Sequence, residues 1–385
     1  MSRCTQALIY KDNLEYNIKQ IKNSVGKNVK VCLAVKADAY GHDAILTSQL
    51  AEKNGIDFLA VATIDEGIEL REAGIKLPIL LLSLCVPDEF EEIFKNDITP
   101  LVFSKEYINL LIKASESFFS DETKFAVHLA VDTGMGRIGC YPQEAGEEAK
   151  LINNSKNLIL SGMCTHFAVS DSLSQENQEY TKNQYNKFMQ AIQSVKNEGF
   201  DPGICHCACS AAFLNNKDMH FDMIRAGIIT YGYYPDEITA EYLQKNNKNF
   251  NVKPIMALKT KIVSIRHFEK GQFISYGRTW QCPKETNIAV LPIGYADGLL
   301  RRFAPGLNVT INGKDYPIVG RICMDQCMVD IGLNNSEVAL WDDVYIFGPK
   351  ECGANNSAQT LAQIGNTIPY EVCTSISKRV KRIIV

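Results

Sequence analysis

The chain has 385 residues, a length that predicts two domains and leaves room for a large α/β barrel in the first. Its 40 basic and 44 acidic residues leave a net charge of −4 and form no basic stripe, which argues against a nucleic-acid partner. The N-terminal residues hold no apolar core of signal-peptide length, and no later run approaches a membrane span. We therefore expect a soluble, cytoplasmic protein with no membrane partner.

Short apolar runs alternate with helical segments through the first part of the chain. The segment 43–55 is one such helix, because Asp43 suits an N-cap and Gly55 suits the residue after the C-cap. Strands that alternate with helices indicate a parallel sheet, and eight of them predict closure into a TIM-like (β/α)8 barrel. The eight runs are VCLAV (31–35), FLAVA (58–62), ILLL (79–82), TPLV (99–102), FAVHLAV (125–131), LILSGM (158–163), GICHCA (203–208) and MIRAGI (223–228).

The composition changes beyond about residue 250. Runs rich in Val, Ile and Thr predict strands there, and Asn312-Gly313 predicts a two-residue hairpin. Helical periodicity returns only at 354–366, in ANNSAQTLAQIGN. The polar stretch 237–251 is the expected linker, so we place a barrel domain at residues 1–245 and a mostly β-strand domain at 246–385. About the first ten residues are free to pair with the second domain.

The cysteines predict reduced, mostly buried thiols, because thirteen is an odd number and the chain is long enough to fold without disulfides. Cys205, Cys207 and Cys209 would share one face of a strand, but zinc ligands usually come as spaced pairs from turns. We therefore expect no metal site. We expect Cys323 and Cys327 to pack as small apolar side chains.

Lys36 is the most informative residue, because it directly follows the apolar run 31–35. A lysine in that position is either a snorkelling surface residue or an amine used in chemistry. Tyr40, Gly41 and His42 place a phenol, a flexible turn and an imidazole at the same strand end. This combination favours a lysine that forms a Schiff base.

Barrel closure would bring the eighth strand beside the first, so Lys36 should meet the loop 225–228. The loops after the seventh and eighth strands of such barrels often bind phosphate through backbone N–H groups, and Ser210 and Gly227 lie in those two loops. A Schiff-base lysine beside a phosphate site predicts pyridoxal 5'-phosphate as the cofactor.

Eight sequence blocks resemble the motifs of the alanine racemase family, in order and at fitting intervals. The resemblance covers nearly the whole chain, and several blocks are specific by themselves. It implies a pyridoxal phosphate-dependent isomerase that interconverts L- and D-alanine, supplies D-alanine for peptidoglycan synthesis and works as a homodimer with active sites at the interface. The blocks are AVKADAYGH (34–42), VDTGMGRIG (131–139), THFAVSD (165–171), MIRAGIITYG (223–232), SYGRTW (275–280), IGYADG (293–298), VGRICMDQCMVDIG (319–332) and TIPYEV (367–372).

The resemblance implies how the cofactor is held. Lys36 would carry it, and Arg225 would face its pyridine nitrogen. Because an arginine keeps its proton, that nitrogen stays unprotonated and the cofactor becomes a weaker electron sink, which favours racemisation over transamination. The phosphate would be held by Tyr40, Ser210, the backbone of Gly227 and Ile228, and Tyr370.

The resemblance also implies two bases, one on each face of the substrate: Lys36 and Tyr276 of the partner subunit. A phenol with a pKa of about 10 needs nearby positive charge to act as a base at neutral pH. His166, hydrogen-bonded to Arg225, would supply that field. The remaining implied roles are Arg137 at the cofactor phenolate oxygen and the substrate, the backbone N–H of Met324 for the substrate carboxylate, Asp325 close by, and Tyr295 with Tyr370 at the entrance.

Other interpretations remain open from the sequence. Residues 134–139 match G-x-G-x-x-G, the fingerprint of a dinucleotide-binding oxidoreductase, although such a motif should open a helix. A barrel that binds the cofactor without turnover, a related decarboxylase, and a serine or broad-specificity racemase are further alternatives. His166, Tyr276 and Tyr295 could be ordinary structural residues, and Arg225 could simply pair with Asp222.

Ala130 departs from the family pattern. Many alanine racemases carry there a lysine whose carbamylated side chain positions the arginine that corresponds to Arg137. An alanine cannot do this, and an unpaired guanidinium that is partly buried is costly, so we expect another anion to take its place. Chloride is the simplest candidate, and a rearranged carboxylate or the cofactor phenolate alone are the alternatives. Cys209, where relatives often have asparagine, is a second departure.

Overall fold

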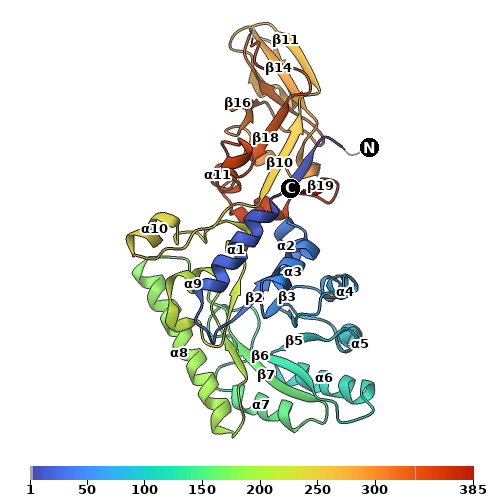
Figure 1. Cartoon of the computed structure of the whole chain (residues 1–385), viewed down its shortest axis with the longest axis vertical. Coiled ribbons are helices and arrows are strands. Elements are labelled where there is room, and N and C mark those ends of the chain that lie inside the picture. Colours follow the sequence, from blue (N-terminus) through green and yellow to red (C-terminus); the bar gives the residue numbers. More distant parts are fainter. Residues whose placement is uncertain (1–2, 334) are drawn as a thin grey trace.

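The computed structural model describes residues 3–333 and 335–385 and contains an α/β barrel and a β-rich domain joined end to end (Figure 1). The barrel fills the lower part of that view and the β-rich domain the upper part. The fold class predicted from the sequence is therefore confirmed.

Parallel strands form the barrel, and all eight predicted runs become strands within residues 30–226. Their order is β8-β7-β6-β5-β4-β3-β2-β9, so the first and last strands of the barrel, β2 and β9, are hydrogen-bonded neighbours. The strands are β2 (Lys30–Ala34), β3 (Phe58–Val61), β4 (Ile79–Leu81), β5 (Ile98–Val102), β6 (Phe125–Ala130), β7 (Leu158–Cys164), β8 (Ile204–His206) and β9 (Met223–Ala226).

The barrel closes between β8 and β9 through separate hydrogen bonds rather than a regular ladder. The Asp222 N–H donates to the carbonyl of Cys205 (3.1 Å) and the Arg225 N–H donates to the carbonyl of Ala208 (2.8 Å). The Asp222 carboxylate in turn accepts from the Cys205 N–H. β8 is therefore shorter than the predicted run 203–208, because its last residues bond to β9 outside a ladder.

Helices cover the outside of the barrel, as the alternation in the sequence predicts (Figure 1). In α3 the Asp43 side chain accepts from the Leu46 N–H, and Gly55 has a φ of +69°, so both predicted helix ends are confirmed. The helices are α1 (Lys11–Ser24), α3 (Ala44–Lys53), α4 (Ile64–Glu72), α5 (Phe90–Lys95), α6 (Lys105–Phe118), α7 (Ala145–Asn154), α8 (Gln175–Asn197) and α9 (Ser210–Asn215). The stretch expected as a linker contains one more helix, α10 (Ala240–Lys245).

The β-rich domain is built on a nine-stranded sheet with the order β11-β14-β17-β16-β15-β18-β10-β1-β19. The predicted hairpin joins β15 to β16 through Asn312 and Gly313, whose φ values of 49° and 79° suit a turn that needs two left-handed residues. The strands are β1 (Gln6–Ile9), β10 (Met256–Lys261), β11 (Ser264–Phe268), β14 (Thr286–Leu291), β15 (Asn308–Ile311), β16 (Lys314–Val319), β17 (Cys327–Asp330), β18 (Asp343–Phe347) and β19 (Lys381–Ile384), with β12 (Phe273–Ile274) and β13 (Trp280–Gln281) as a separate pair.

The first and last strands, β1 and β19, pair with each other in the sheet of the β-rich domain. β1 pairs antiparallel with β10 and parallel with β19, so the first strand of the chain belongs to the sheet of the β-rich domain. Two short helices, α11 (Ala358–Ile364) and α12 (Pro369–Thr374), precede β19, and α12 packs against the segment α2 (Lys36–Gly41) at the mouth of the barrel. The end of the chain therefore helps to shape the carboxyl ends of the barrel strands.

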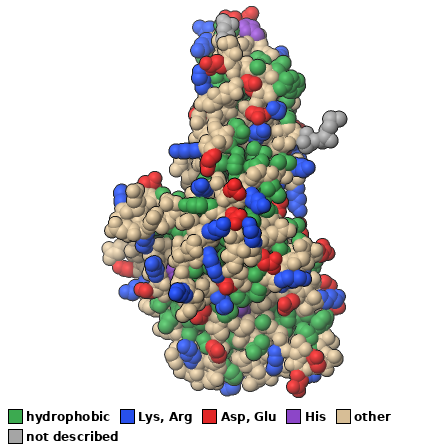
Figure 2. All heavy atoms as spheres, viewed as in Figure 1, with side chains coloured by type: hydrophobic (Ala, Val, Ile, Leu, Met, Phe, Trp, Pro, Cys, Tyr) green, Lys and Arg blue, Asp and Glu red, His purple; other side chains and the backbone are tan. Residues whose placement is uncertain are grey.

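Charges of both signs are mixed on the surface. On the face drawn in Figure 2, Lys and Arg lie among Asp and Glu without forming a stripe of one sign. Among the described residues, we find no helix with the length and apolar character needed to cross a lipid bilayer.

Candidate active site

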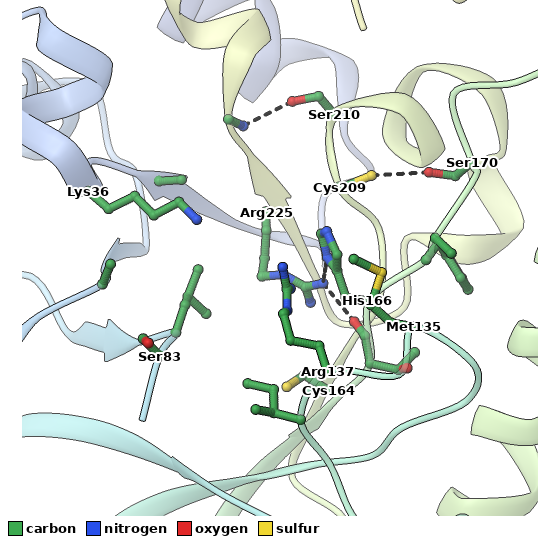
Figure 3. A pocket seen from close by; sticks show the side chains of 18 of the residues that line it. Lys36, Ser83, Met135, Arg137, Cys164, His166, Ser170, Cys209, Ser210 and Arg225 are labelled. Carbon is green, nitrogen blue, oxygen red and sulfur yellow. Dashed lines mark hydrogen bonds between the residues drawn. The ribbon is translucent and has the colours of Figure 1, made fainter. Parts of the chain in front are cut away.

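A cavity of about 650 Å³ opens at the carboxyl ends of the barrel strands. Its volume is that of a typical small-molecule site. It opens on the face of the barrel where barrel enzymes carry their catalytic residues. It contains nine of the residues predicted from the sequence, namely Lys36, Tyr40, Arg137, His166, Ser210, Arg225, Gly227, Ile228 and Tyr370. Figure 3 shows the side chains of Lys36, Arg137 and Arg225 around it; Lys36 follows β2, Arg137 lies on the loop after β6, and Arg225 belongs to β9.

Lys36 begins α2, a turn with unusual backbone geometry. Ala37, Asp38, Ala39 and Tyr40 have φ values of 52° to 56°, and Gly41 has a φ of +83°, so the turn is left-handed. Each non-glycine residue in such a left-handed turn costs roughly 1–2 kcal/mol, and strain of this kind is concentrated at functional sites. Since residues four apart lie on the same side of a helical turn, Lys36 and Tyr40 both face the cavity.

Burial lowers the pKa of Lys36 below its usual value, and the nearby Arg137 guanidinium lowers it further, while Glu66 opposes the shift. A lowered pKa increases the neutral fraction of the amine at a given pH. Neutral amine is the form that acts as a nucleophile or accepts a proton.

Arg225 is held by a buried network at the end of β9. Its Nη1 donates to Nδ1 of His206 (2.6 Å) and to the His206 carbonyl (2.9 Å), and its Nη2 donates to the Thr165 carbonyl (2.7 Å) and to Nδ1 of His166 (3.3 Å). Only 7 % of Arg225 is exposed. The alternative pairing with Asp222 is wrong, because that carboxylate accepts from the Cys205 N–H instead.

The network fixes the protonation of two histidines. A guanidinium only donates, so Nδ1 of His206 must accept, and its Nε2 must carry the proton that it donates to Nδ1 of His128 (2.9 Å). Burial lowers the pKa of His206 well below its usual value and that of His128 to about 3. Both imidazoles are therefore neutral at pH 7.

His166 is neutral as well. Burial, and then the charge of Arg225, lowers its pKa to about 3. With Nδ1 accepting from Arg225, the proton of the neutral ring sits on Nε2. The expectation that His166 itself supplies a positive field is wrong, since Arg225 carries the charge and His166 presents an N–H.

A second part of the cavity, formed by Tyr40, Ser210, Gly227 and Tyr370, is called the Ser210 corner here. The Gly227 N–H donates to Ser210 Oγ (3.0 Å), and a Cβ added at Gly227 would lie 3.0 Å from Tyr40 Oη. The rings of Tyr40 and Tyr370 lie 5.8 Å apart. Burial raises the pKa of Tyr40 to about 12, so its hydroxyl stays a donor at neutral pH. Hydroxyl and backbone donors in one corner suit an anionic group.

Arg137 lies on the loop after β6, and no described residue accepts a hydrogen bond from its guanidinium or forms an ion pair with it. The nearest acid in the sequence, Asp132, accepts from the Gly134 and Gly136 N–H groups instead. Ala130 ends β6 and lies in an apolar cluster with Leu101 and Cys164. The expectation that Ala130 leaves Arg137 without a protein anion is consistent with this arrangement. The expectation that the Arg137 guanidinium is partly buried is wrong, because Arg137 is exposed.

The dinucleotide alternative is not supported by the structure. Residues 134–139 form a loop in which all three glycines have positive φ, and the next helix, α7, begins only at Ala145. The motif therefore does not open a helix, as a dinucleotide site would require.

The cysteine cluster is mostly buried. Cys205 and Cys207 are buried and Cys209 is partly exposed, with its thiol 3.2 Å from Ser170 Oγ. No group of three His, Cys, Asp or Glu side chains among the described residues is arranged to hold a metal ion. Cys327 is buried as expected, whereas Cys323 is partly exposed.

The remaining predicted residues lie on the β-rich domain, away from this cavity. Tyr276, Met324 and Tyr295 are 70 %, 52 % and 39 % exposed and do not line the cavity with Lys36. Tyr276 lines a groove on its own domain. Asp325 forms an ion pair with Arg379 (2.6 Å), which also bonds to the buried Asp297 (2.7 Å).

Sequence reasoning missed the residues that support the site from behind. His206 fixes Arg225, although the sequence marks it only by its place between Cys205 and Cys207. Glu66, which accepts from the Ala37 N–H (2.6 Å), and Arg382, which donates to the Gly41 carbonyl (3.0 Å), carried no recognisable signal in the sequence.

Comparisons with known proteins agree along the whole chain. The family models "Alanine racemase, N-terminal domain" and "Alanine racemase, C-terminal domain" match residues 9–235 and 255–384. The alanine racemase of Treponema denticola is 49 % identical over 385 residues, which cover 100 % of this chain and 98 % of that protein. The alanine racemase of Treponema pallidum is 39 % identical, covering 99 % of each.

Solved structures give the same result. The alanine racemase of Clostridium difficile superposes with a TM-score of 0.89 at 38 % identity, covering 100 % of this chain and 96 % of that one. The Bacillus anthracis enzyme, solved with bound L-Ala-P, superposes with a TM-score of 0.90 at 36 % identity and the same coverage. The resemblance of the sequence blocks is thereby confirmed, and the chain is an enzyme of the alanine racemase family, whose members interconvert L- and D-alanine.

Proposed function

We propose that the chain racemises alanine with pyridoxal phosphate held in the barrel cavity, using Lys36 and the partner's Tyr276 as the two bases. The observation that carries the proposal is the convergence of Lys36, Arg225 and the Ser210 corner on one cavity. Membership of the family makes this chemistry the expected one.

The residues present fit this cofactor. Lys36, Arg137 and Arg225 line the cavity, with Asp171 as the one carboxylate among its described lining residues, so the site favours anions. The Ser210 corner supplies hydroxyl and backbone donors suited to the phosphate, with Ile228 beside it. A side chain at position 227 would crowd Tyr40 Oη, which supports close approach of a ligand to the backbone of Gly227.

Pyridoxal phosphate, when bound, supplies an electron sink that makes the α-proton of an amino acid acidic. Arg225 would then face the ring nitrogen. Because the guanidinium is held by His206 and Thr165 and keeps its protons at any working pH, it cannot protonate that nitrogen.

Proton transfer needs one base on each side of the α-carbon. Lys36, with a pKa lowered chiefly by burial, is suited to take or return the proton on one side. On the other side we assign the partner's Tyr276. The neutral His166 would present its Nε2 proton to that phenol oxygen, and the charge of Arg225 behind it would stabilise the phenolate.

The exposed residues of the β-rich domain support a homodimer. Tyr276, Met324 and Tyr295 have side chains suited to the second half of the site, yet none of them reaches the cavity of its own chain. In a symmetric dimer each β-rich domain could serve the partner's barrel. Met324 N–H would then bind the substrate carboxylate, with Asp325 and Arg137 close by and Tyr295 narrowing the entrance beside Tyr370.

The biological assignment follows from the proposed reaction. D-alanine made by this enzyme would supply peptidoglycan synthesis, and a cytoplasmic location stays a prediction. The substrate range is the finer question, since serine or a broader set of amino acids would need only a roomier pocket.

The test is direct. Purified protein is incubated separately with L-alanine, D-alanine and L-serine, and optical activity is followed. We expect both alanine enantiomers to reach the same racemic end point and serine to react more slowly. Borohydride reduction should fix pyridoxal phosphate to the peptide that contains Lys36. Labelling of any other lysine would refute the assignment.

A further inference from the structure

The left-handed turn Ala37–Gly41 is held at both ends by charged side chains from other elements. At its start, the Ala37 N–H donates to Glu66 Oε1 (2.6 Å), while the other oxygen of Glu66 accepts from the Ala62 N–H (2.7 Å). At its end, the Gly41 carbonyl accepts from Arg382 Nε (3.0 Å). The strained turn is thus fixed by contacts that are remote in sequence.

Arg382 uses its remaining donors on the segment that follows α12. Its Nη1 donates to the carbonyls of Ser377 (2.7 Å) and Val380 (2.8 Å), and its Nη2 donates to the carbonyl of Ile376 (2.7 Å). One guanidinium therefore bonds to four carbonyls and joins the left-handed turn to the end of the chain. Because the fork of an arginine is rigid, these carbonyls are fixed relative to one another.

The turn and α12 approach each other closely at Gly41. A Cβ added there would lie 2.6 Å from the Cys373 carbonyl oxygen, and the φ of +83° already favours glycine. α12 carries Tyr370, whose ring lies 5.8 Å from that of Tyr40. Displacing the Gly41 carbonyl from Arg382 would therefore move both phenols of the Ser210 corner relative to each other.

We propose that Arg382 is a positioning residue for the cofactor phosphate, which it serves by holding the left-handed turn so that Tyr40 and Tyr370 converge. Arg382 does not line the cavity and acts only through the turn and α12. The role towards the phosphate rests on the proposed function, because that function supplies the ligand. The restraint that Arg382 places on the turn does not depend on the proposed function. The residue that sets the geometry of the barrel pocket thus comes from the last strand of the β-rich domain.

The experiment compares Arg382→Gln, Arg382→Lys and the control Lys381→Gln, which removes the charge of the exposed neighbour on β19. Amide hydrogen exchange is measured on the apoprotein for peptides covering residues 36–43 and, as an internal reference, 58–61. We expect exchange in 36–43 to quicken about tenfold in Arg382→Gln, the change that loss of one hydrogen bond from a charged donor produces. The reference peptide and the Lys381→Gln protein should match the wild type.

The second readout is the preference for phosphate. Dissociation constants for pyridoxal phosphate and for pyridoxal, which lacks the phosphate, are measured for each protein. We expect Arg382→Gln to weaken binding of pyridoxal phosphate about tenfold and binding of pyridoxal less than threefold. Arg382→Lys should be intermediate, because its ammonium keeps the charge and can still donate but lacks the rigid fork of the guanidinium. The proposal would be overturned if binding of both compounds weakened equally. It would also be overturned if amide hydrogen exchange in residues 36–43 were unchanged in the folded variants.

Two further outcomes also bear on the role of Arg382. If Arg382→Gln does not fold, the same two measurements on Arg382→Lys decide, and wild-type values for both would refute the role. If exchange quickens in 36–43 but wild-type protein binds neither pyridoxal compound, the restraint on the turn is real, and the proposed cofactor, along with the role of Arg382 towards its phosphate, is wrong.

Discussion

The barrel cavity and the exposed face of the β-rich domain carry the two halves of the candidate site, and they are built differently. In the cavity, Arg225 is 7 % exposed and bonds to His206, His166 and Thr165. On the β-rich domain, Tyr276 is 70 % exposed, and its hydroxyl has no hydrogen bond to any described residue. The first half is fixed before a ligand arrives, whereas the second half is exposed and, in the proposed dimer, would gain its surroundings from the partner chain.

This difference separates binding from turnover. If the barrel half is complete in itself, it should hold the cofactor whatever happens to Tyr276. If the β-rich half is needed for proton transfer, its removal should lower the rate and leave cofactor binding intact. Substitutions in the barrel cavity and on the β-rich domain test whether binding and turnover separate in this way.

The largest effect is expected at Lys36. Lys36→Ala would remove both the proposed attachment point and one of the two proposed bases, so racemisation should fall by about 10⁴-fold or more, the upper range for a positioned acid–base group. Absorbance of the purified protein and polarimetry are the measurements. Exposed Lys381→Gln should retain full activity. Substantial turnover by Lys36→Ala would show that the base on the barrel side lies elsewhere.

Tyr276→Phe should act only on turnover. We expect a loss of at least about 10² in racemisation, the lower range for a general acid–base group, with pyridoxal phosphate still bound. The decisive measurement is deuterium uptake from solvent at the α-carbon of each enantiomer, because losing one base affects the two directions differently. Tyr141→Phe, at another exposed tyrosine, is the matched control. Wild-type exchange in both enantiomers would contradict the two-base scheme.

Mixing the two damaged chains tests whether the halves belong to different subunits. Lys36→Ala and Tyr276→Phe chains, once exchanged, should regain up to about a quarter of the wild-type activity, because half of the dimers are mixed and each holds one intact site. Subunit exchange is confirmed with a size-tagged chain. Complete exchange without recovery would mean that each site is built within one chain.

The sequence could predict those features of the fold and the site that local patterns encode. The eight apolar runs became the barrel strands, because the alternation of strands and helices is a local pattern that tertiary contacts reinforce. Lys36 was recognisable because a cation after a buried strand conflicts with its local pattern, and such conflicts mark functional positions.

Other features depend on contacts that no local pattern reveals. The left-handed turn at Ala37–Gly41 goes against the preference of four of its residues, so only the surrounding contacts select it. His206 binds Arg225 across the barrel closure, a contact between neighbouring strand ends that carries no motif. Arg382 reaches Gly41 from 341 positions away. Sequence reasoning located the residues that face the cavity better than those that hold them.

The smallest expected effect concerns the anion beside Arg137. Ala130 sits in an apolar cluster with Leu101 and Cys164, so the guanidinium has no protein anion there among the described residues. We expect a bound halide to orient it, and replacing chloride by acetate at constant ionic strength should lower activity by about twofold to fivefold, a modest change because solvent screens an exposed guanidinium. Bicarbonate should have no effect on the wild type, whereas Ala130→Lys should make activity depend on it. Identical rates and cofactor affinities in both buffers would mean that Arg137 needs no bound anion.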